Sequence, residues 1–128
     1  MEKIKYVNEM IESDIPYFIC PNELFDKKII ITDSQTHKQR SIDCQETLIF
    51  IFLLRCCNGG KKAFPSYNYI ADKCKCSKRK AMYAITNLFD NDFIVKKNRG
   101  YIPGNENQIV KNYSNIYEIN HKKLKNIV

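Results

Sequence analysis

Two short helical patterns in the middle of the chain lie very close together. Ser66 precedes one pattern, over residues 67–73, and Ser77 precedes the other, over residues 78–90. Serine is a preferred residue at the start of a helix because its hydroxyl accepts a free backbone N–H. Only the tripeptide CKC separates the two patterns. This short link constrains the fold more than any other feature, because two short helices joined by three residues must turn sharply.

A connection of this length between short helices has the dimension of a helix-turn-helix. The second pattern also has one apolar face, formed at spacings of i, i+3, i+4 and i+7 by Ala81, Ala84, Ile85 and Leu88. The opposite face carries Arg79, Tyr83 and Asn87. The sequence therefore predicts a helix that packs on a core with one side and exposes the other.

The flanking segments extend this motif to a larger fold. Residues 42–60 are predicted to form a helix, because Asp43 and Glu46 make a capping-box pair and two glycines follow. Residues 93–97 and 114–120 favour strands that form a hairpin with a long loop. The sequence thus predicts an α+β fold, mainly α: a winged helix-turn-helix with a three-helix core and a β-hairpin wing.

The segments at the two ends are less patterned. Pro21 indicates the start of a short docking helix, residues 27–33 favour a strand and residues 34–40 a polar loop. We divide the chain into an N-terminal extension (1–42) with a short docking helix and a possible strand, a winged helix domain (43–120) and a C-terminal tail (121–128).

Positive charge is concentrated in one segment of the chain. The whole chain has a formal net charge of +7, and residues 55–100 hold 11 basic and only 3 acidic side chains. Such a patch fits nucleic acid, an acidic membrane surface or an acidic protein.

Part of this charge falls at the start of a predicted helix. Lys78, Arg79 and Lys80 occupy its first turn. There the helix dipole is positive, and each exposed cation costs a few tenths to about 1 kcal/mol. The arrangement makes sense if DNA phosphates, or O6 and N7 of guanine, supply the missing negative charge.

Four stretches match a known pattern in order: ETLIFIFLLR (46–55), FPSYNYIA (64–71), CSKRKAMYAITNLFDNDFIVKK (76–97) and SNIYEI (114–119). With them, the segment 43–119 resembles the winged helix-turn-helix domains of plasmid and phage replication initiators and related bacterial regulators. The resemblance implies binding of double-stranded DNA in replication initiation or maintenance, conjugation or transcription regulation.

The chain departs from that pattern at the turn and at the helix start. Lys75 stands where the family usually has glycine, and it would strain a left-handed backbone by roughly 1 kcal/mol. Lys80 replaces a small β-branched residue, which changes what the helix could recognise. Cys74 and Cys76 replace buried aliphatic residues, which favours core thiols.

The candidate DNA-binding residues lie on the two helices, the turn and the wing. Arg79 is the candidate for base readout, because a guanidinium can donate two parallel hydrogen bonds to guanine. Tyr83 has two open interpretations, a DNA contact or packing flat over its neighbours. In the wing, lysines would follow the phosphates and Arg99 would enter the minor groove. The full set is Ser66, Lys75, Ser77, Lys78, Arg79, Lys80, Tyr83, Asn87, Lys96, Lys97 and Arg99.

No sequence pattern indicates catalysis, a metal or a cofactor, so we expect a non-enzymatic protein. The chain shows no signal-peptide pattern and its longest apolar run is too short to cross a membrane, so we expect a cytoplasmic protein. A homodimer is expected because one module makes few base contacts. Two alternatives stay open. One is an interaction module that docks an acidic partner, and the other is a thiol sensor built on Cys56, Cys57, Cys74 and Cys76.

Overall fold

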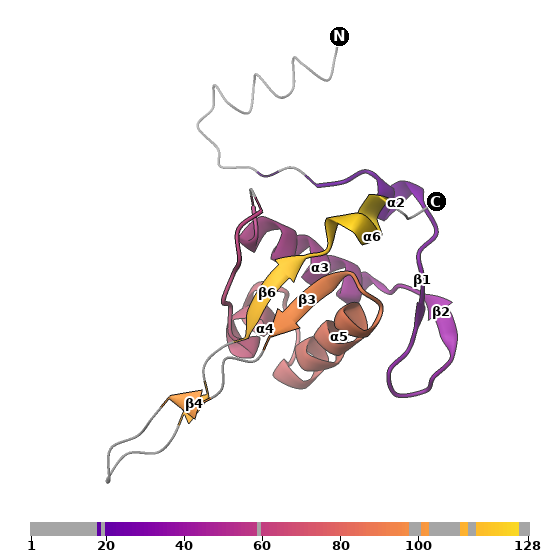
Figure 1. Ribbon diagram of the computed structural model, residues 1–128. Helices are drawn as coiled ribbons and strands as arrows, with labels where there is room; N and C mark the ends of the chain where they lie inside the picture. The colour runs from indigo at the N-terminus through magenta and orange to yellow at the C-terminus, as the bar shows by residue number, and fades with distance from the viewer. Residues whose placement is uncertain are drawn as a thin grey trace.

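The computed structural model describes residues 18, 20–58, 60–97, 101–102, 111–112 and 115–125 (Figure 1). These residues form five helices and six strands. In chain order the elements are α2 (Glu23–Asp26), β1 (Ile30–Thr32), β2 (Gln39–Ser41), α3 (Cys44–Cys56), α4 (Tyr67–Lys73), α5 (Lys78–Asp90), β3 (Ile94–Lys97), β4 (Tyr101–Ile102), β5 (Lys111–Asn112), β6 (Ile116–Ile119) and α6 (His121–Lys125).

The three main helices begin where their capping residues predict. Asp43 and Glu46 form a full capping box at α3, because each side chain accepts a hydrogen bond from the backbone N–H of the other. Ser66 Oγ accepts from Tyr69 N at α4, and Ser77 Oγ accepts from Lys80 N at α5, both at 3.1 Å. The predicted bounds of α4 and α5 are confirmed, whereas α3 ends a few residues before the glycines.

The turn between α4 and α5 contains the predicted strain. Lys75 has a φ of 59°, in the left-handed region, and its side chain is exposed. The chain then closes the turn with a hydrogen bond from Cys76 N to the carbonyl oxygen of Ala71, at 3.0 Å. Cys74 is 2% exposed and belongs to the core. A lysine thus occupies a conformation that favours glycine, at a cost of roughly 1 kcal/mol.

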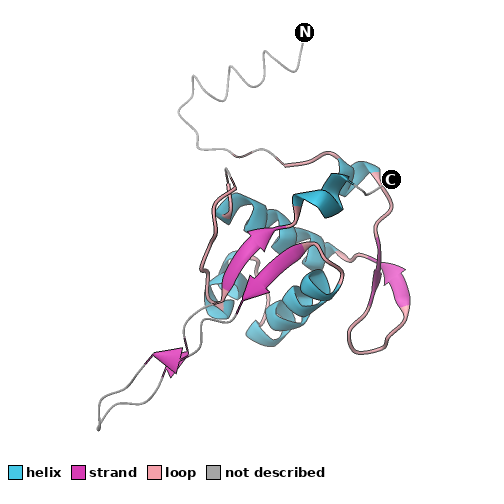
Figure 2. Cartoon of the chain, viewed as in Figure 1, coloured by secondary structure: helices cyan, strands magenta, loops and turns pink. Residues whose placement is uncertain are grey.

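One core joins the three helices to the wing strands. The predicted apolar stripe of α5 is confirmed, since Ala81, Ala84, Ile85 and Leu88 are all at most 2% exposed. Ile49, Phe50 and Leu53 of α3 are fully buried in the same cluster. The rings of Phe50 and of Phe93, which lies just before β3, pack edge to face with 5.6 Å between ring centres. Figure 2 shows the grouped helices beside the wing strands.

The wing follows α5 directly. Strands β3 and β6 pair antiparallel, with Ile94 opposite Ile119 and Lys97 opposite Ile116. Farther out, the backbone pairs again as β4 with β5. Three helices followed by this hairpin make the mainly α fold a winged helix-turn-helix, as predicted.

The segment before α3 belongs to the same body. Strands β1 and β2 form a second antiparallel hairpin, with Ile31 opposite Arg40. Leu24, Ile29 and Ile31 are buried in the core cluster that also contains α3 and α5. The polar loop predicted over residues 34–40 is therefore shorter than expected, because its last two residues lie in β2. A further helix, α6, forms in the predicted C-terminal tail.

Candidate nucleic-acid interface

The first turn of α5 presents three consecutive cations to solvent. Lys78, Arg79 and Lys80 are exposed, and the turn contains no acidic residue. Within the part of the chain that the structure describes, no carboxylate forms an ion pair with any of the three. The unfavourable charge at this helix end is therefore not compensated by the described residues.

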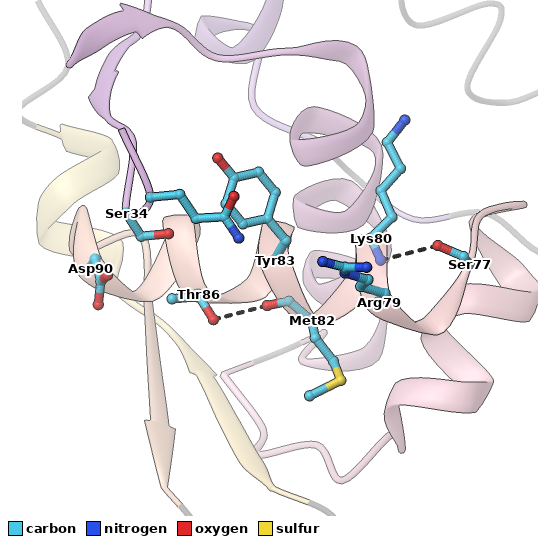
Figure 3. A pocket seen from close by; sticks show the side chains of 9 residues that line it. Ser34, Ser77, Arg79, Lys80, Met82, Tyr83, Thr86 and Asp90 are labelled. Atoms are coloured by element: carbon cyan, nitrogen blue, oxygen red, sulfur yellow. Dashed lines mark hydrogen bonds between the residues drawn. The ribbon is translucent and has the colours of Figure 1, made fainter. Parts of the chain in front are cut away.

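An open groove of about 690 Å³ runs along the exposed side of α5 (Figure 3). Arg79 and Lys80 lie at the amino end of this α5 groove, and Asp90 lies at its other end. One edge is formed by the turn that joins β1 to β2. The lining residues are Ser34, Gln35, Ser77, Arg79, Lys80, Met82, Tyr83, Thr86 and Asp90. The groove can accept a ligand that carries negative charge opposite its amino end.

The prediction that Asn87 faces outward toward DNA is wrong. Asn87 is fully buried, and its Nδ2 donates to Glu46 Oε2 at 2.7 Å. Its Oδ1 accepts from the backbone N–H of Ser34 at 2.8 Å. The β1–β2 hairpin covers this side of α5, so a polar residue that periodicity places opposite the core is used inside the protein.

Tyr83 lies one turn before Asn87 on α5 and also contacts the β1–β2 hairpin. Its ring is half-buried, and its hydroxyl donates a hydrogen bond to Asp33 Oδ2. This bond raises the pKa of the Tyr83 hydroxyl. At the C-cap of α5, four residues after Asn87, Asn91 exchanges two hydrogen bonds with the backbone of Thr32, at 2.9 and 3.0 Å. Tyr83, Asn87 and Asn91 therefore form a seam that holds the hairpin, and the packing interpretation of Tyr83 is favoured.

A buried ion cluster lies behind this seam. The Arg40 guanidinium donates to both carboxylate oxygens of Glu46, at 2.7 and 2.8 Å, and to Asp33 at 3.0 Å. The side chains of Asp33 and Glu46 are only 4% and 2% exposed. The cluster could not be predicted from the sequence, because Asp33 lies in the turn after β1, Arg40 in β2 and Glu46 in α3. The capping role of Glu46 was its only visible signal.

The cluster shifts the pKa of both carboxyl groups downward. The hydrogen bond from Tyr83 is the main cause at Asp33, where burial opposes it and the N–H groups of Thr36 and Gln35 add to it. At Glu46, burial raises the pKa, but the bonds from Arg40, the Asp43 N–H and Asn87 outweigh it. Both groups are therefore stabilised in the charged form in the folded protein.

We expect the protein to lose stability in acid. An unfolded chain binds protons at Asp33 and Glu46 near pH 4, whereas the folded chain resists this, so the free energy of unfolding should fall as the pH drops below about 5. Urea titrations at a series of pH values measure this dependence. The double variant Asp33→Asn, Glu46→Gln should have a flatter profile, and Glu23→Gln, which removes an exposed carboxylate, should keep the wild-type profile. A wild-type stability that is constant from pH 6 to about pH 3 would contradict the expectation.

The other predicted site residues divide into three groups. Lys75 and Lys97 are exposed, whereas Lys96 is half-buried with its Nζ 5.1 Å from the centre of the Phe89 ring. Ser66 and Ser77 act as helix caps. Arg99 lies outside the described residues. The structure therefore presents Lys75, Lys97 and the α5 cations to solvent.

Three of the four thiols of the sensor alternative have raised pKa values. Burial raises the pKa of both Cys57 and Cys74 to about 11, and it also raises that of Cys56. A thiol with a raised pKa forms little of the reactive thiolate at neutral pH. Among the described residues, no group of His, Cys, Asp or Glu side chains is arranged to hold a metal ion. These observations favour core packing over a sensor role for Cys56, Cys57 and Cys74, and Cys76 is half-buried against the same core.

Comparison with protein families matches residues 45–94 to a helix-turn-helix domain. The match begins in α3, covers α4, the turn and α5, and ends at the first residue of β3. No curated protein and no solved structure matches the chain. In the described part of the chain, no helix is long and apolar enough to span a membrane. The match supports a helix-turn-helix domain of the kind that binds DNA. The short turn between α4 and α5 makes α5 the second helix of such a motif.

Proposed function

We propose that the protein is a non-enzymatic, sequence-specific binder of double-stranded DNA, with α5 as the recognition helix in the major groove. One observation carries the proposal. The amino end of the second helix of the motif exposes Lys78, Arg79 and Lys80 without a carboxylate partner among the described residues. In helix-turn-helix proteins, the amino-terminal residues of this helix contact base edges.

Each exposed cation has a separate task in this proposal. Arg79 donates two hydrogen bonds to O6 and N7 of a guanine. Lys78 and Lys80 flank it and pair with phosphates, and Lys75 adds a charge from the turn. Lys97 of the wing follows the backbone farther along. Because Asn87 is buried, the contacts on α5 are restricted to its first turns and to the exposed edge of the groove.

The cellular role that we propose follows from the sequence resemblance. The chain acts in the cytoplasm in plasmid or phage replication initiation or maintenance, in conjugation or in transcription regulation. A homodimer on two half-sites is the form that we propose, since a single module buries little surface on DNA and makes few base contacts.

Wild-type protein should bind duplex DNA with a steep salt dependence. About five phosphate contacts would give a slope of roughly −4 to −5 for the logarithm of the binding constant against the logarithm of the salt concentration. Mobility shifts across a salt series measure this slope. Lys78→Ala should make it less steep by about 1, whereas Lys122→Ala, which removes an exposed charge on α6, should leave it unchanged. Absence of duplex binding at low salt would overturn the proposal and favour docking of an acidic protein.

A further inference from the structure

We propose that the turn between β1 and β2, residues 34–38, is a second DNA-contacting arm that holds the phosphate backbone on the side of α5 away from the wing. This inference rests on the proposed function, because it takes α5 to lie in the major groove. It adds a contact surface outside the segment that matches the helix-turn-helix family.

The position of the turn supports this role. Ser34 and Gln35 line the same groove as Arg79 and Lys80, so a ligand that fills the groove also meets the turn. In Figure 1, α5 lies between strand β3 of the wing and the β1–β2 hairpin. A duplex that receives α5 in its major groove would therefore have protein on both flanks of that groove.

The turn also has a surface that suits phosphate. Its residues 35–38 are exposed and offer an amide, a hydroxyl, an imidazole and the ammonium group of Lys38. Side chains of these kinds make many of the phosphate contacts in protein–DNA complexes. The acidic residue next to them in sequence, Asp33, is 3% exposed and accepts hydrogen bonds from Arg40 and Tyr83. Its carboxylate is therefore paired with the Arg40 guanidinium and kept away from an approaching backbone. Asp90 is exposed but lies at the far end of the groove.

The turn is held in a fixed place relative to α5. Asp33 Oδ1 accepts from the N–H groups of Gln35 and Thr36, at 2.8 and 3.1 Å, which fixes the shape of the turn. The bond from Ser34 N to Asn87 Oδ1 ties the turn to the recognition helix. A contact surface that is already ordered loses little conformational entropy on binding. The same bonds that remove Asn87 from the DNA surface thus position another element for it.

The test uses the variant Lys38→Ala on a duplex that the wild-type protein binds. We expect about fivefold weaker binding at low salt, a slope less steep by about 1 and an unchanged base preference. Hydroxyl-radical footprinting should show that protection is lost on one flank of the site, whereas Lys97→Ala should lose the other flank. Lys28→Ala is the matched control, because Lys28 is exposed, precedes β1 and does not line the groove.

The outcomes separate this inference from the proposed function. If the wild-type protein gives no shift and no footprint, both are overturned. If the wild-type protein binds and Lys38→Ala has the same affinity, slope and footprint, the recognition helix stands and the second arm is rejected. Loss of the same flank in Lys38→Ala and Lys97→Ala would also reject the arm, because the turn and the wing would then not lie on opposite sides of the groove.

Discussion

Replacing Arg40 with methionine should lower the free energy of unfolding by about 3 kcal/mol, the largest stability change that we expect from one substitution. Methionine keeps the apolar stem but removes the guanidinium that pairs with Asp33 and Glu46. Both carboxylates are almost fully buried, so each would keep its desolvation cost without its partner. Urea unfolding should show a midpoint lower by roughly 2 M, with little change in slope.

The expected loss of stability comes from the unpaired carboxylates of Asp33 and Glu46, so removing these charges as well is the control. Adding Asp33→Asn and Glu46→Gln to the Arg40 variant should recover part of the lost stability, because neutral amides tolerate burial better than unpaired carboxylates. Arg55→Met, which removes an exposed arginine of α3, should change the free energy of unfolding by less than about 0.5 kcal/mol. If the loss of unfolding free energy in the triple variant equals the sum of the losses in the three single variants, the three charges do not interact and the ion cluster does not stabilise the hairpin as described.

The helices of the domain could be predicted from local signals. Ser66 and Ser77 each accept a hydrogen bond from the backbone N–H three residues ahead, so both residues of each cap lie within one helical turn of sequence. The stripe from Ala81 to Leu88 fixes which side of α5 is buried. The strain at Lys75 could also be predicted, because the turn needs a residue in the left-handed backbone conformation whatever its side chain. Each of these features depends on residues close together in sequence.

The error at Asn87 has a physical cause that local pattern does not contain. Helical periodicity places polar residues on the solvent side, but Asn87 meets Glu46 and Ser34, which lie 41 and 53 residues away. Both of its hydrogen-bonding ends are satisfied there, so burial carries no penalty. Periodicity places Tyr83 on the same side, and its hydrogen bond to Asp33 is what favours packing on the hairpin over a DNA contact.

The β1–β2 hairpin was the least predictable part of the site. Strand β2 contains only Gln39, Arg40 and Ser41, none of which favours a strand strongly. It forms because β1 supplies a partner and because the Arg40 side chain reaches the cluster behind α5. The edge that this hairpin adds to the α5 groove could therefore not be inferred without coordinates.

Arg79→Ala should abolish discrimination at one base pair of the DNA site. Arg79 is the second residue of α5, exposed and without an ion-pair partner among the described residues, so its guanidinium is available for a guanine. A bidentate contact of this kind contributes about 1–3 kcal/mol of preference, which corresponds to about 5- to 150-fold between the right and the wrong base. Lys78→Ala removes a neighbouring charge and should weaken all duplexes alike.

Selection of bound sites from a pool of random duplexes, run in parallel for the wild type, Arg79→Ala and Lys78→Ala, tests most directly whether the amino end of α5 contacts DNA bases. The account predicts that the wild type and Lys78→Ala enrich one shared motif containing guanine. Arg79→Ala should enrich the same motif with a single guanine position relaxed. The contradicting result is an identical motif for Arg79→Ala and the wild type, or no enriched motif for the wild type, since either would remove α5 as the recognition helix.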